Sequence, residues 1–170
     1  MPNTYFQFKQ FIVHQEKSAM KVCTDSCLFG AWAANHLCNT NKNVNRILDV
    51  GAGTGLLSLM LAQQCDAIID AVETDGSSAN EANENFLQSS WQERLHCYEK
   101  RIQDFYAKET YDFIICNPPF YEKDLLGKNK PNNVAHHNAG LILRELITAV
   151  KRLLNEEGSF AILLPYHRTK

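Results

Sequence analysis

The sequence predicts an α/β protein with a doubly wound, mostly parallel sheet of the Rossmann-like type. Three features predict this fold. Short apolar runs alternate with helical segments, a glycine-rich turn follows one of these runs, and long connections separate most successive runs. Connections of this length favour parallel strands joined by right-handed crossovers, with helices on both faces of the sheet. We expect one domain, which is usual for 170 residues.

Five segments have the apolar or alternating pattern of a strand. RILDV is a buried run just before the glycines, and YDFIICN has a nearly continuous apolar core. The expected strands span residues 46–50, 67–73, 94–100, 111–117 and 159–165. The last strand is closed by Pro165.

Helical periodicity appears between these strands and once before them. The segments between the strands are residues 56–64, 77–88 and 140–154. The last of these is strongly amphipathic, and we expect Gly158 to close it. Before the first strand, Thr24 or Asp25 is a suitable N-cap for a helix through residues 26–37.

The composition is that of an ordinary globular protein, with 45% hydrophobic and 21% charged residues. A net charge of −2 argues against nonspecific coating of nucleic acid, but a local basic patch remains compatible with binding one folded RNA. No apolar run approaches the roughly 18 residues of a membrane span, and no secretory signal is recognisable. The six cysteines lack the spacing of zinc ligands, so we expect reduced thiols, no metal and a cytoplasmic protein.

Unusual residues collect at the ends of the expected strands. In open α/β sheets, ligands bind beyond the carboxyl ends of the strands. Here those ends carry the glycine turn GAGTG at residues 51–55, Glu73, and the tetrapeptide NPPF at residues 117–120. Glycines let a ligand approach the backbone closely, and the following helix N-terminus offers free N–H groups.

Each of these features also has a plain structural explanation. A glycine turn is often only a tight connection, Glu73 alone could be a solvated strand end, and NPPF could be a rigid turn with a core phenylalanine. Their occurrence together at one sheet edge favours a ligand site. No Lys-Ser/Thr pair follows the glycines, which disfavours a phosphate-binding loop of the NTPase type.

Longer stretches around these features resemble a known family. LDVGAGTGLLSLMLAQ is similar to the first motif of the class I S-adenosylmethionine-dependent methyltransferases, and NPPF to the motif of members that methylate amino groups conjugated to a π system. The leader KQFIVHQEKSAMKVCTDSCLFGAW resembles the tRNA (valine) adenine-N6 methyltransferase family, which modifies the purine 3′ of the anticodon. The resemblance implies S-adenosyl-L-methionine as cofactor, S-adenosyl-L-homocysteine as product, and tRNA as partner.

The resemblance also assigns roles to parts of the chain. Residues 1–45 become a leader and cofactor lid, and residues 46–170 the methyltransferase core. The residues expected to bind the cofactor are Lys21, Thr24, Asp25, Asp49, Gly51, Gly53, Gly55, Glu73, Asp104 and Asn117. Glu73 would hold the ribose. Asp104 is assigned because Arg101 stands where the family has an acidic residue that pairs with the cofactor adenine.

The catalytic residues that the resemblance implies are Asn117, Pro118, Pro119 and Phe120. The N6 amine of adenine is a poor nucleophile because its lone pair is delocalised into the ring. The Asn117 side-chain carbonyl and the Pro118 backbone carbonyl would accept its two N–H protons, and the prolines would preorganise both acceptors. Phe120 would stack on the base. The in-line methyl transfer then depends on positioning and needs no metal.

A polar loop follows NPPF and is too long for a simple connection. We expect it to contact RNA phosphates, although loop lysines are as often only solvated. The substrate-binding residues expected are Phe120, Tyr121, Lys123, Lys128, Lys130 and His137.

The class I fold usually ends with an antiparallel strand hairpin, and the sequence shows no counterpart after the fifth strand. We therefore expect a chain that is truncated at its carboxyl end. The fifth strand would then be an exposed apolar edge, through which the protein could self-associate.

Three alternatives remain. Enzymes that methylate a glutamine amide in release factors use a similar motif, but they carry a helical domain before the core, whereas 45 residues precede the first strand here. NPPF alone does not separate adenine N6 from guanine N2 of ribosomal RNA. A non-catalytic binding partner with this fold is disfavoured by the intact glycine turn and Asn117.

Overall fold

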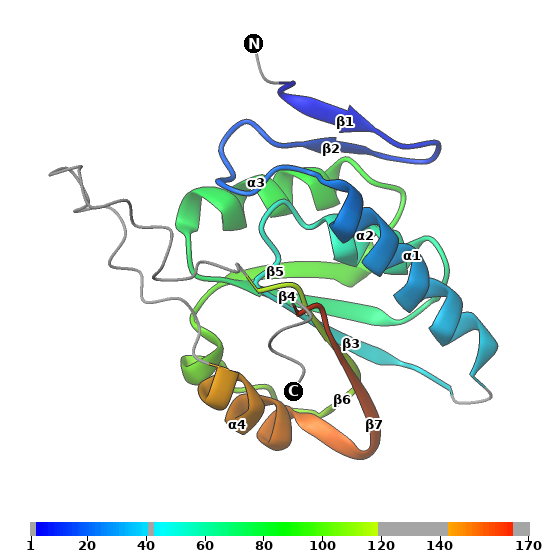
Figure 1. Cartoon of the computed structure of the whole chain (residues 1–170), viewed down its shortest axis with the longest axis vertical. Coiled ribbons are helices and arrows are strands. Elements are labelled where there is room, and N and C mark those ends of the chain that lie inside the picture. Colours follow the sequence, from blue (N-terminus) through cyan, green and yellow to red (C-terminus); the bar gives the residue numbers. More distant parts are fainter. Residues whose placement is uncertain (1–2, 41–42, 119–142, 165–170) are drawn as a thin grey trace, which may run out of the picture.

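The computed structural model describes residues 3–40, 43–118 and 143–164. Its centre is a five-stranded sheet with the order β5-β4-β3-β6-β7 (Figure 1). The strands are β3 (Arg46–Val50), β4 (Ile68–Glu73), β5 (Leu95–Glu99), β6 (Tyr111–Cys116) and β7 (Leu154–Ile162). All neighbouring strands pair in parallel, which confirms the predicted doubly wound sheet.

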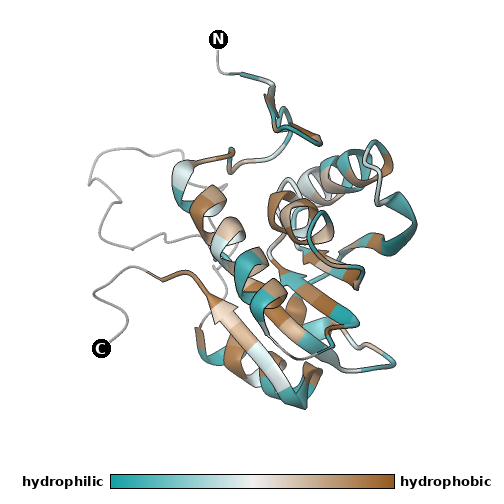
Figure 2. Ribbon diagram, turned by 90° about the vertical axis from the view of Figure 1, so that its right-hand side faces the viewer, coloured by the Kyte–Doolittle hydropathy of each residue, from teal (hydrophilic) through white to brown (hydrophobic). Residues whose placement is uncertain are grey.

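Helices cover both faces of the sheet, with the apolar strands between them (Figures 1 and 2). The helices are α1 (Thr24–Asn39), α2 (Leu56–Ala62), α3 (Gly76–Leu87) and α4 (Leu143–Leu153), with two 3₁₀ turns, η1 (Gln92–Arg94) and η2 (Ile102–Asp104). The first three helices pack in one core and α4 packs in the other. Because side chains of a strand alternate between faces, Ile47 lies in the first core and its neighbour Leu48 in the second.

The leader contains an antiparallel hairpin that was not predicted from the sequence. It consists of β1 (Tyr5–Gln7) and β2 (Ile12–His14). Phe11 and Val13 are buried and join the core of the first three helices. Strands of three residues are too short to show a recognisable alternation.

The N-cap of α1 differs from the prediction. Thr24 and Asp25 lie inside the first turn, and Cys23 is the N-cap. The Ser26 hydroxyl accepts the Cys23 N–H at 3.3 Å and donates to the Cys23 carbonyl at 2.9 Å. These reciprocal bonds begin the helix earlier than predicted. Asp25 still favours the helix, because a negative charge in the first turn interacts well with the helix dipole.

The junction between α4 and β7 also differs from the prediction. The helix ends at Leu153 and the strand begins at the next residue, so Gly158 lies within β7 instead of closing the helix. A side chain at Gly158 would place its Cβ 2.7 Å from the Leu154 side chain, so close packing explains the glycine. The register against β6 is irregular here, with five steps along β7 opposite two along β6.

Three further observations concern the described part of the chain. None of its helices has the length and apolar content of a membrane-spanning segment. No group of three or more His, Cys, Asp or Glu side chains in that part is placed to hold a metal ion. All six cysteines are free thiols, and burial raises the pKa of Cys97 to about 12.

Candidate active site

The glycine turn leaves the carboxyl end of β3 and leads into α2. Gly51, Gly53 and Gly55 have φ angles of 75°, 53° and 78°, in the left-handed region. The N–H groups of Gly51 and Ala52 donate to the Val72 carbonyl at 2.8 and 3.2 Å, which ties the turn to β4. Because only glycine adopts such φ angles without strain, the shape of this turn depends on its three glycines.

Gly55 is the most constrained of the three glycines. A Cβ atom at Gly55 would lie 2.5 Å from the ring of Phe86, whereas at Gly53 no heavy atom lies within 4 Å. We expect Gly55→Ala to lower the free energy of unfolding by about 2–4 kcal/mol, because a clash adds to the backbone strain. Gly53→Ala adds only backbone strain and should lower the free energy of unfolding by about 1 kcal/mol. Urea denaturation measures both; equal losses would contradict the role of Phe86.

Glu73 ends β4 with its carboxylate against the glycine turn. One carboxylate oxygen accepts the Gly53 N–H at 2.9 Å. The other accepts the N–H groups of Thr74 and Asp75 at 2.7 and 3.0 Å. Glu73 therefore joins the glycine turn to the start of α3, where Asp75 is the N-cap. The side chain remains half-buried, and its predicted contact with a ribose stays a prediction.

Asp49 is fully buried in β3, next to the glycine turn. Its Oδ2 accepts the N–H of Ser58 at 3.2 Å and the Ser58 hydroxyl at 2.7 Å. Its Oδ1 has no hydrogen-bond partner within the described residues. Burial raises the pKa of Asp49 to about 6, against the effect of the two bonds from Ser58. A buried carboxylate oxygen without a partner is costly, and a cationic ligand group would relieve that cost.

The raised pKa of Asp49 predicts a pH dependence of stability. Its folded-state pKa of about 6 exceeds the ordinary value of 3.8, so the folded protein binds the proton more tightly than the unfolded chain. The contribution of Asp49 is therefore largest below pH 4 and is lost as the pH rises to about 6, a loss of about 3 kcal/mol.

Asp49→Asn removes this titration and isolates it from the other carboxylates. The unfolding free energy of the variant minus that of the unchanged protein should increase by about 3 kcal/mol as the pH rises from 4 to 7, because only the unchanged protein loses the contribution of Asp49. Chemical denaturation at a series of pH values measures the difference. A difference that stays constant with pH would contradict the raised pKa.

Asn117 follows β6, the strand next to β3. Since Val50 is paired with Cys116, Asp49 and Asn117 lie at the carboxyl ends of neighbouring strands. Five buried side-chain atoms of the described residues lack a hydrogen-bond partner, namely Ser18 Oγ, Arg46 Nε, Asp49 Oδ1, Asn117 Oδ1 and Asn155 Oδ1. Two of these five therefore lie at the sheet edge where the sequence predicts a ligand.

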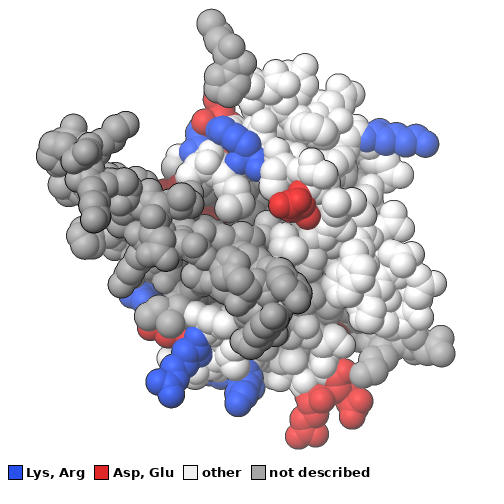
Figure 3. Space-filling model, in the orientation of Figure 1, with Lys and Arg blue, Asp and Glu red and all other residues white. Residues whose placement is uncertain are grey.

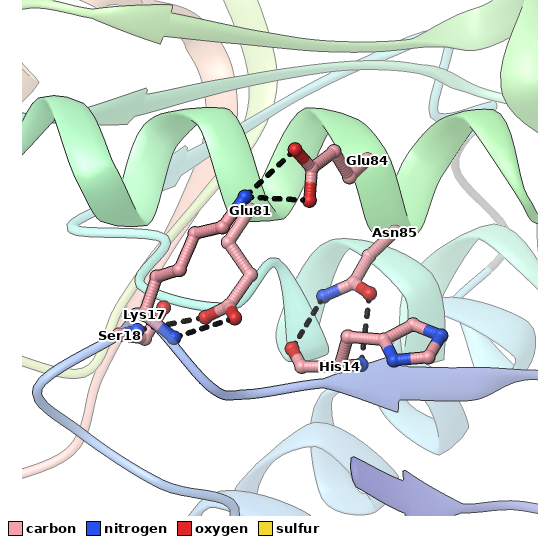
Figure 4. A network of polar contacts seen from close by, with 6 residues as sticks. All are labelled: His14, Lys17, Ser18, Glu81, Glu84 and Asn85. Carbon is pink, nitrogen blue, oxygen red and sulfur yellow. Dashed lines mark hydrogen bonds and ion pairs between the residues drawn. The ribbon is translucent and has the colours of Figure 1, made fainter. Parts of the chain in front are cut away.

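Glu81 of α3 holds the leader in place (Figure 4). Its buried carboxylate accepts the backbone N–H groups of Lys17 and Ser18, both at 2.8 Å. Burial works to raise the pKa of Glu81, but these N–H donors outweigh it and the pKa lies below its usual value. The Lys17 ammonium also pairs with Glu84 at 2.8 Å, in a half-exposed position.

Asn85, four residues after Glu81 on α3, connects the leader to the glycine turn. It accepts the N–H of His14 at 2.8 Å, and its amide group donates to the His14 carbonyl oxygen at 2.9 Å (Figure 4). The same amide group donates to the Thr54 carbonyl oxygen, also at 2.9 Å. Neither α3 residue was predicted from the sequence. The sequence gives little indication of their role, because the helix contains several Glu and Asn residues, and Glu81 and Asn85 look like those on its exposed face.

The structure describes the three predicted lid residues and Asp104, which was predicted to contact the cofactor adenine. The Lys21 ammonium donates to backbone carbonyls of the preceding turn, that of Ser18 at 3.0 Å among them. Thr24 and Asp25 are exposed in α1, and Asp104 is exposed in η2. Contacts of these four residues with a cofactor stay predictions.

Pro118 directly follows Asn117 and is half-buried. The remaining predicted catalytic and substrate-binding residues lie outside the described residues. These are Pro119, Phe120, Tyr121, Lys123, Lys128, Lys130 and His137.

A glycine turn, an acidic strand end and an asparagine whose Oδ1 has no partner among the described residues thus share the carboxyl edge of one parallel sheet. Residues 31–169 match the sequence model of the family described as Methyltransferase small domain. The chain belongs to this family. Membership of the methyltransferase small domain family agrees with the methyltransferase resemblance predicted from the glycine turn and NPPF.

Two relatives that are similar over almost the whole chain carry the same name. A tRNA1(Val) (adenine(37)-N6)-methyltransferase of Dyadobacter fermentans is 49% identical over 96% of this chain. A protein of that name from Cytophaga hutchinsonii is 46% identical over 96% of this chain. This chain spans 66% and 68% of the lengths of these relatives. They confirm the predicted resemblance to the tRNA (valine) adenine-N6 methyltransferase family.

Solved structures support the fold. A SAM-dependent methyltransferase from Agrobacterium tumefaciens has a TM-score of 0.68 and 14% identity, and the match covers 99% of this chain and 56% of that one. The glycopeptide N-methyltransferase MtfA with S-adenosyl-L-methionine has a TM-score of 0.57 and 13% identity, covering 79% of this chain and 53% of that one. At these identities the likeness concerns the fold alone, and it confirms the class I methyltransferase type.

Proposed function

We propose that this chain transfers the methyl group of S-adenosyl-L-methionine to the exocyclic N6 amine of an adenine in the anticodon loop of a tRNA. The observation that carries the proposal is a pair of buried acceptors, Asp49 Oδ1 and Asn117 Oδ1, which lie on neighbouring strand ends and have no partner among the described residues. One acceptor is a carboxylate and the other a neutral amide carbonyl, so they suit two different ligand groups.

The residues of the β3 and β4 ends fit the cofactor. Within the described residues Asp49 Oδ1 has no partner, and the ammonium group of the methionine moiety would supply one. The three left-handed glycines present backbone without side chains at Gly51 and Gly53, where no heavy atom lies within 4 Å of a Cβ position. Glu73, at the neighbouring strand end, would accept hydrogen bonds from ribose hydroxyls. When bound, S-adenosyl-L-methionine supplies an electrophilic methyl group.

Asn117 suits the amine that receives the methyl group. Its buried carbonyl accepts one N–H of the adenine N6 amine, and the backbone carbonyl of Pro118 accepts the other. Both acceptors draw the nitrogen lone pair out of the ring system, which makes the amine a better nucleophile. Acceptors that are already in place need no rearrangement during the reaction.

The named relatives support the choice of substrate. Both are called tRNA1(Val) (adenine(37)-N6)-methyltransferases, and their similarity extends over almost the whole chain. We also propose a cytoplasmic location, where tRNA is available and free thiols persist. Self-association through the outer edge of β7, which pairs only with β6 within the described residues, stays a prediction that light scattering tests.

Incubation of tRNA, and separately of ribosomal RNA and of a release factor, with the protein and isotope-labelled cofactor tests the proposal, with mass spectrometry of the nucleosides and peptides as the measurement. We expect labelled N6-methyladenosine. Labelled N2-methylguanosine from ribosomal RNA, or a methylated glutamine in a release factor, would replace the proposed substrate by one of the alternatives. No heat of S-adenosyl-L-methionine binding in calorimetry would instead indicate a non-catalytic protein.

A further inference from the structure

A groove lies between η2 and α4, on the opposite face of the sheet from the leader. It has a volume of about 380 Å³. The side chains that line it include Gln103, Tyr106, Arg144, Glu145, Thr148 and Arg152. None of these residues belongs to the predicted cofactor or catalytic set.

Tyr106 forms an aromatic platform in this groove. The residue is 76% exposed, although the guanidinium of Arg152 lies over one face at 4.3 Å from the ring centroid. Arg152 in turn donates to the carbonyl oxygens of Ile102 and Gln103 at 3.2 and 3.4 Å. The ring therefore has a guanidinium against it, while most of its surface is exposed. An exposed aromatic ring backed by an arginine is suited to stacking on a nucleobase.

The two segments that form the groove carry a net positive charge, unlike the chain as a whole. Residues 100–109 and 143–153 contain six Lys or Arg and three Asp or Glu, whereas the whole chain has a net charge of −2. Two of the acids have partners: Glu145 accepts from Gln103 at 2.7 Å, and Glu109 pairs with Arg46 at 3.1 Å. Several Lys and Arg side chains lie at the lower left of Figure 3, with an acidic side chain beside them, and others lie near its top.

The topology places the amino end of α4 at the edge of the sheet that carries the candidate active site. The chain runs from β6 through α4 to β7, and β6 and β7 are parallel. The connecting helix therefore runs against the strands, so its first turn, with the exposed Arg144, lies at the same edge as Asn117. The η2 turn also follows the carboxyl end of a strand, β5. The groove thus begins beside the site and extends away from it.

We propose that this groove binds an RNA strand that continues from the methylated base, with Arg144 contacting a phosphate and Tyr106 stacking on an unpaired base. The inference rests on the proposed function and names a surface by which that function recognises its tRNA. Cationic side chains bind phosphates and exposed aromatic rings stack on bases, and residues of both kinds line this groove.

Three variants test the inference through the dissociation constant of tRNA, measured by fluorescence anisotropy at several salt concentrations. Tyr106→Ala should weaken binding roughly tenfold, and Tyr106→Phe, which keeps the ring, should restore it. Arg144→Ala should weaken binding. It should also reduce the magnitude of the slope of the logarithm of the binding constant against the logarithm of the salt concentration by about 1, the amount expected for the loss of one phosphate contact. The matched control is Lys9→Ala, which removes an exposed charge at the β1–β2 turn and should change neither quantity. All variants should bind S-adenosyl-L-methionine as the unchanged protein does.

The outcomes separate this inference from the proposed function. If the unchanged protein binds and methylates tRNA and the groove variants bind tRNA no more weakly than Lys9→Ala, the groove does not hold RNA and the inference is overturned. A groove that serves a protein partner instead would give that same result. If the unchanged protein binds no tRNA at all, the proposed function fails and the inference fails with it.

Discussion

Replacement of Asn117 by alanine should lower the rate of methyl transfer by about 10²–10³-fold, because the adenine amine loses a preorganised acceptor at the reacting nitrogen. Binding of S-adenosyl-L-methionine should stay within a few-fold of the unchanged protein, since Asp49, the glycine turn and Glu73 remain. Single-turnover transfer from labelled cofactor to tRNA measures the first quantity, and calorimetric titration measures the second. Near-normal transfer by the variant would refute the catalytic role of Asn117.

Asn155 offers a matched control for this experiment. Its side-chain carbonyl is also buried without a partner within the described residues, but its amide donates to Asp112 near the amino ends of the strands. Asn155→Ala therefore removes the same chemical group far from the candidate site. We expect it to change stability and to leave the rate of methyl transfer unchanged. A comparable loss of rate in both variants would show that the effect of Asn117→Ala reflects general damage to the fold.

Replacement of Glu81 by alanine should lower the free energy of unfolding by about 2–4 kcal/mol, since it leaves two backbone N–H groups without their acceptor. The N–H of Ser18 is the more costly of the two, because Ser18 is almost completely buried. The leader should also separate more readily from α3. Urea denaturation measures the stability, and hydrogen exchange of the amides of residues 14–22 measures the opening of the leader.

Glu84→Gln is the control for the role of Glu81. It breaks the ion pair with the ammonium of Lys17, whose side chain is 47% exposed, but leaves the backbone hydrogen bonds to Glu81 intact. A surface ion pair of this kind contributes at most about 1 kcal/mol. If Glu84→Gln destabilised the protein as much as Glu81→Ala, charge rather than backbone hydrogen bonding would hold the leader.

The five strands and the ligand edge of the sheet could be predicted from short sequence patterns. Buried parallel strands are continuous apolar runs, and RILDV and YDFIIC show this pattern directly. The glycine turn is recognisable because left-handed φ angles strongly favour glycine. The carboxyl ends of parallel strands share one edge, so the positions of Asp49, Glu73 and Asn117 at strand ends are enough to predict that they lie together.

The leader and the helix boundaries were less predictable. Strands of three residues show no clear period, so the β1–β2 hairpin was missed. Cys23 as N-cap was missed because the deciding hydrogen bonds come from Ser26, a residue within the helix. Gly158 resembled a helix terminator, yet its close contact with Leu154 is a property of the folded β7 segment. Each error arose because the deciding feature, a very short strand or a contact of one particular side chain, leaves no periodic pattern in the sequence.

The sequence by itself determined the α/β class, the order of its main elements, and the edge where the candidate site lies, because periodicity and turn chemistry are local properties of the chain. Only the tertiary structure decided which buried polar groups have partners. Asp70 accepts the Tyr111 hydroxyl at 2.8 Å and the Arg46 guanidinium at 2.7 Å, while Asp49 and Asn117 each retain a buried oxygen without a partner among the described residues. Such partners come from segments tens of residues apart, so their presence or absence depends on packing that no local pattern encodes.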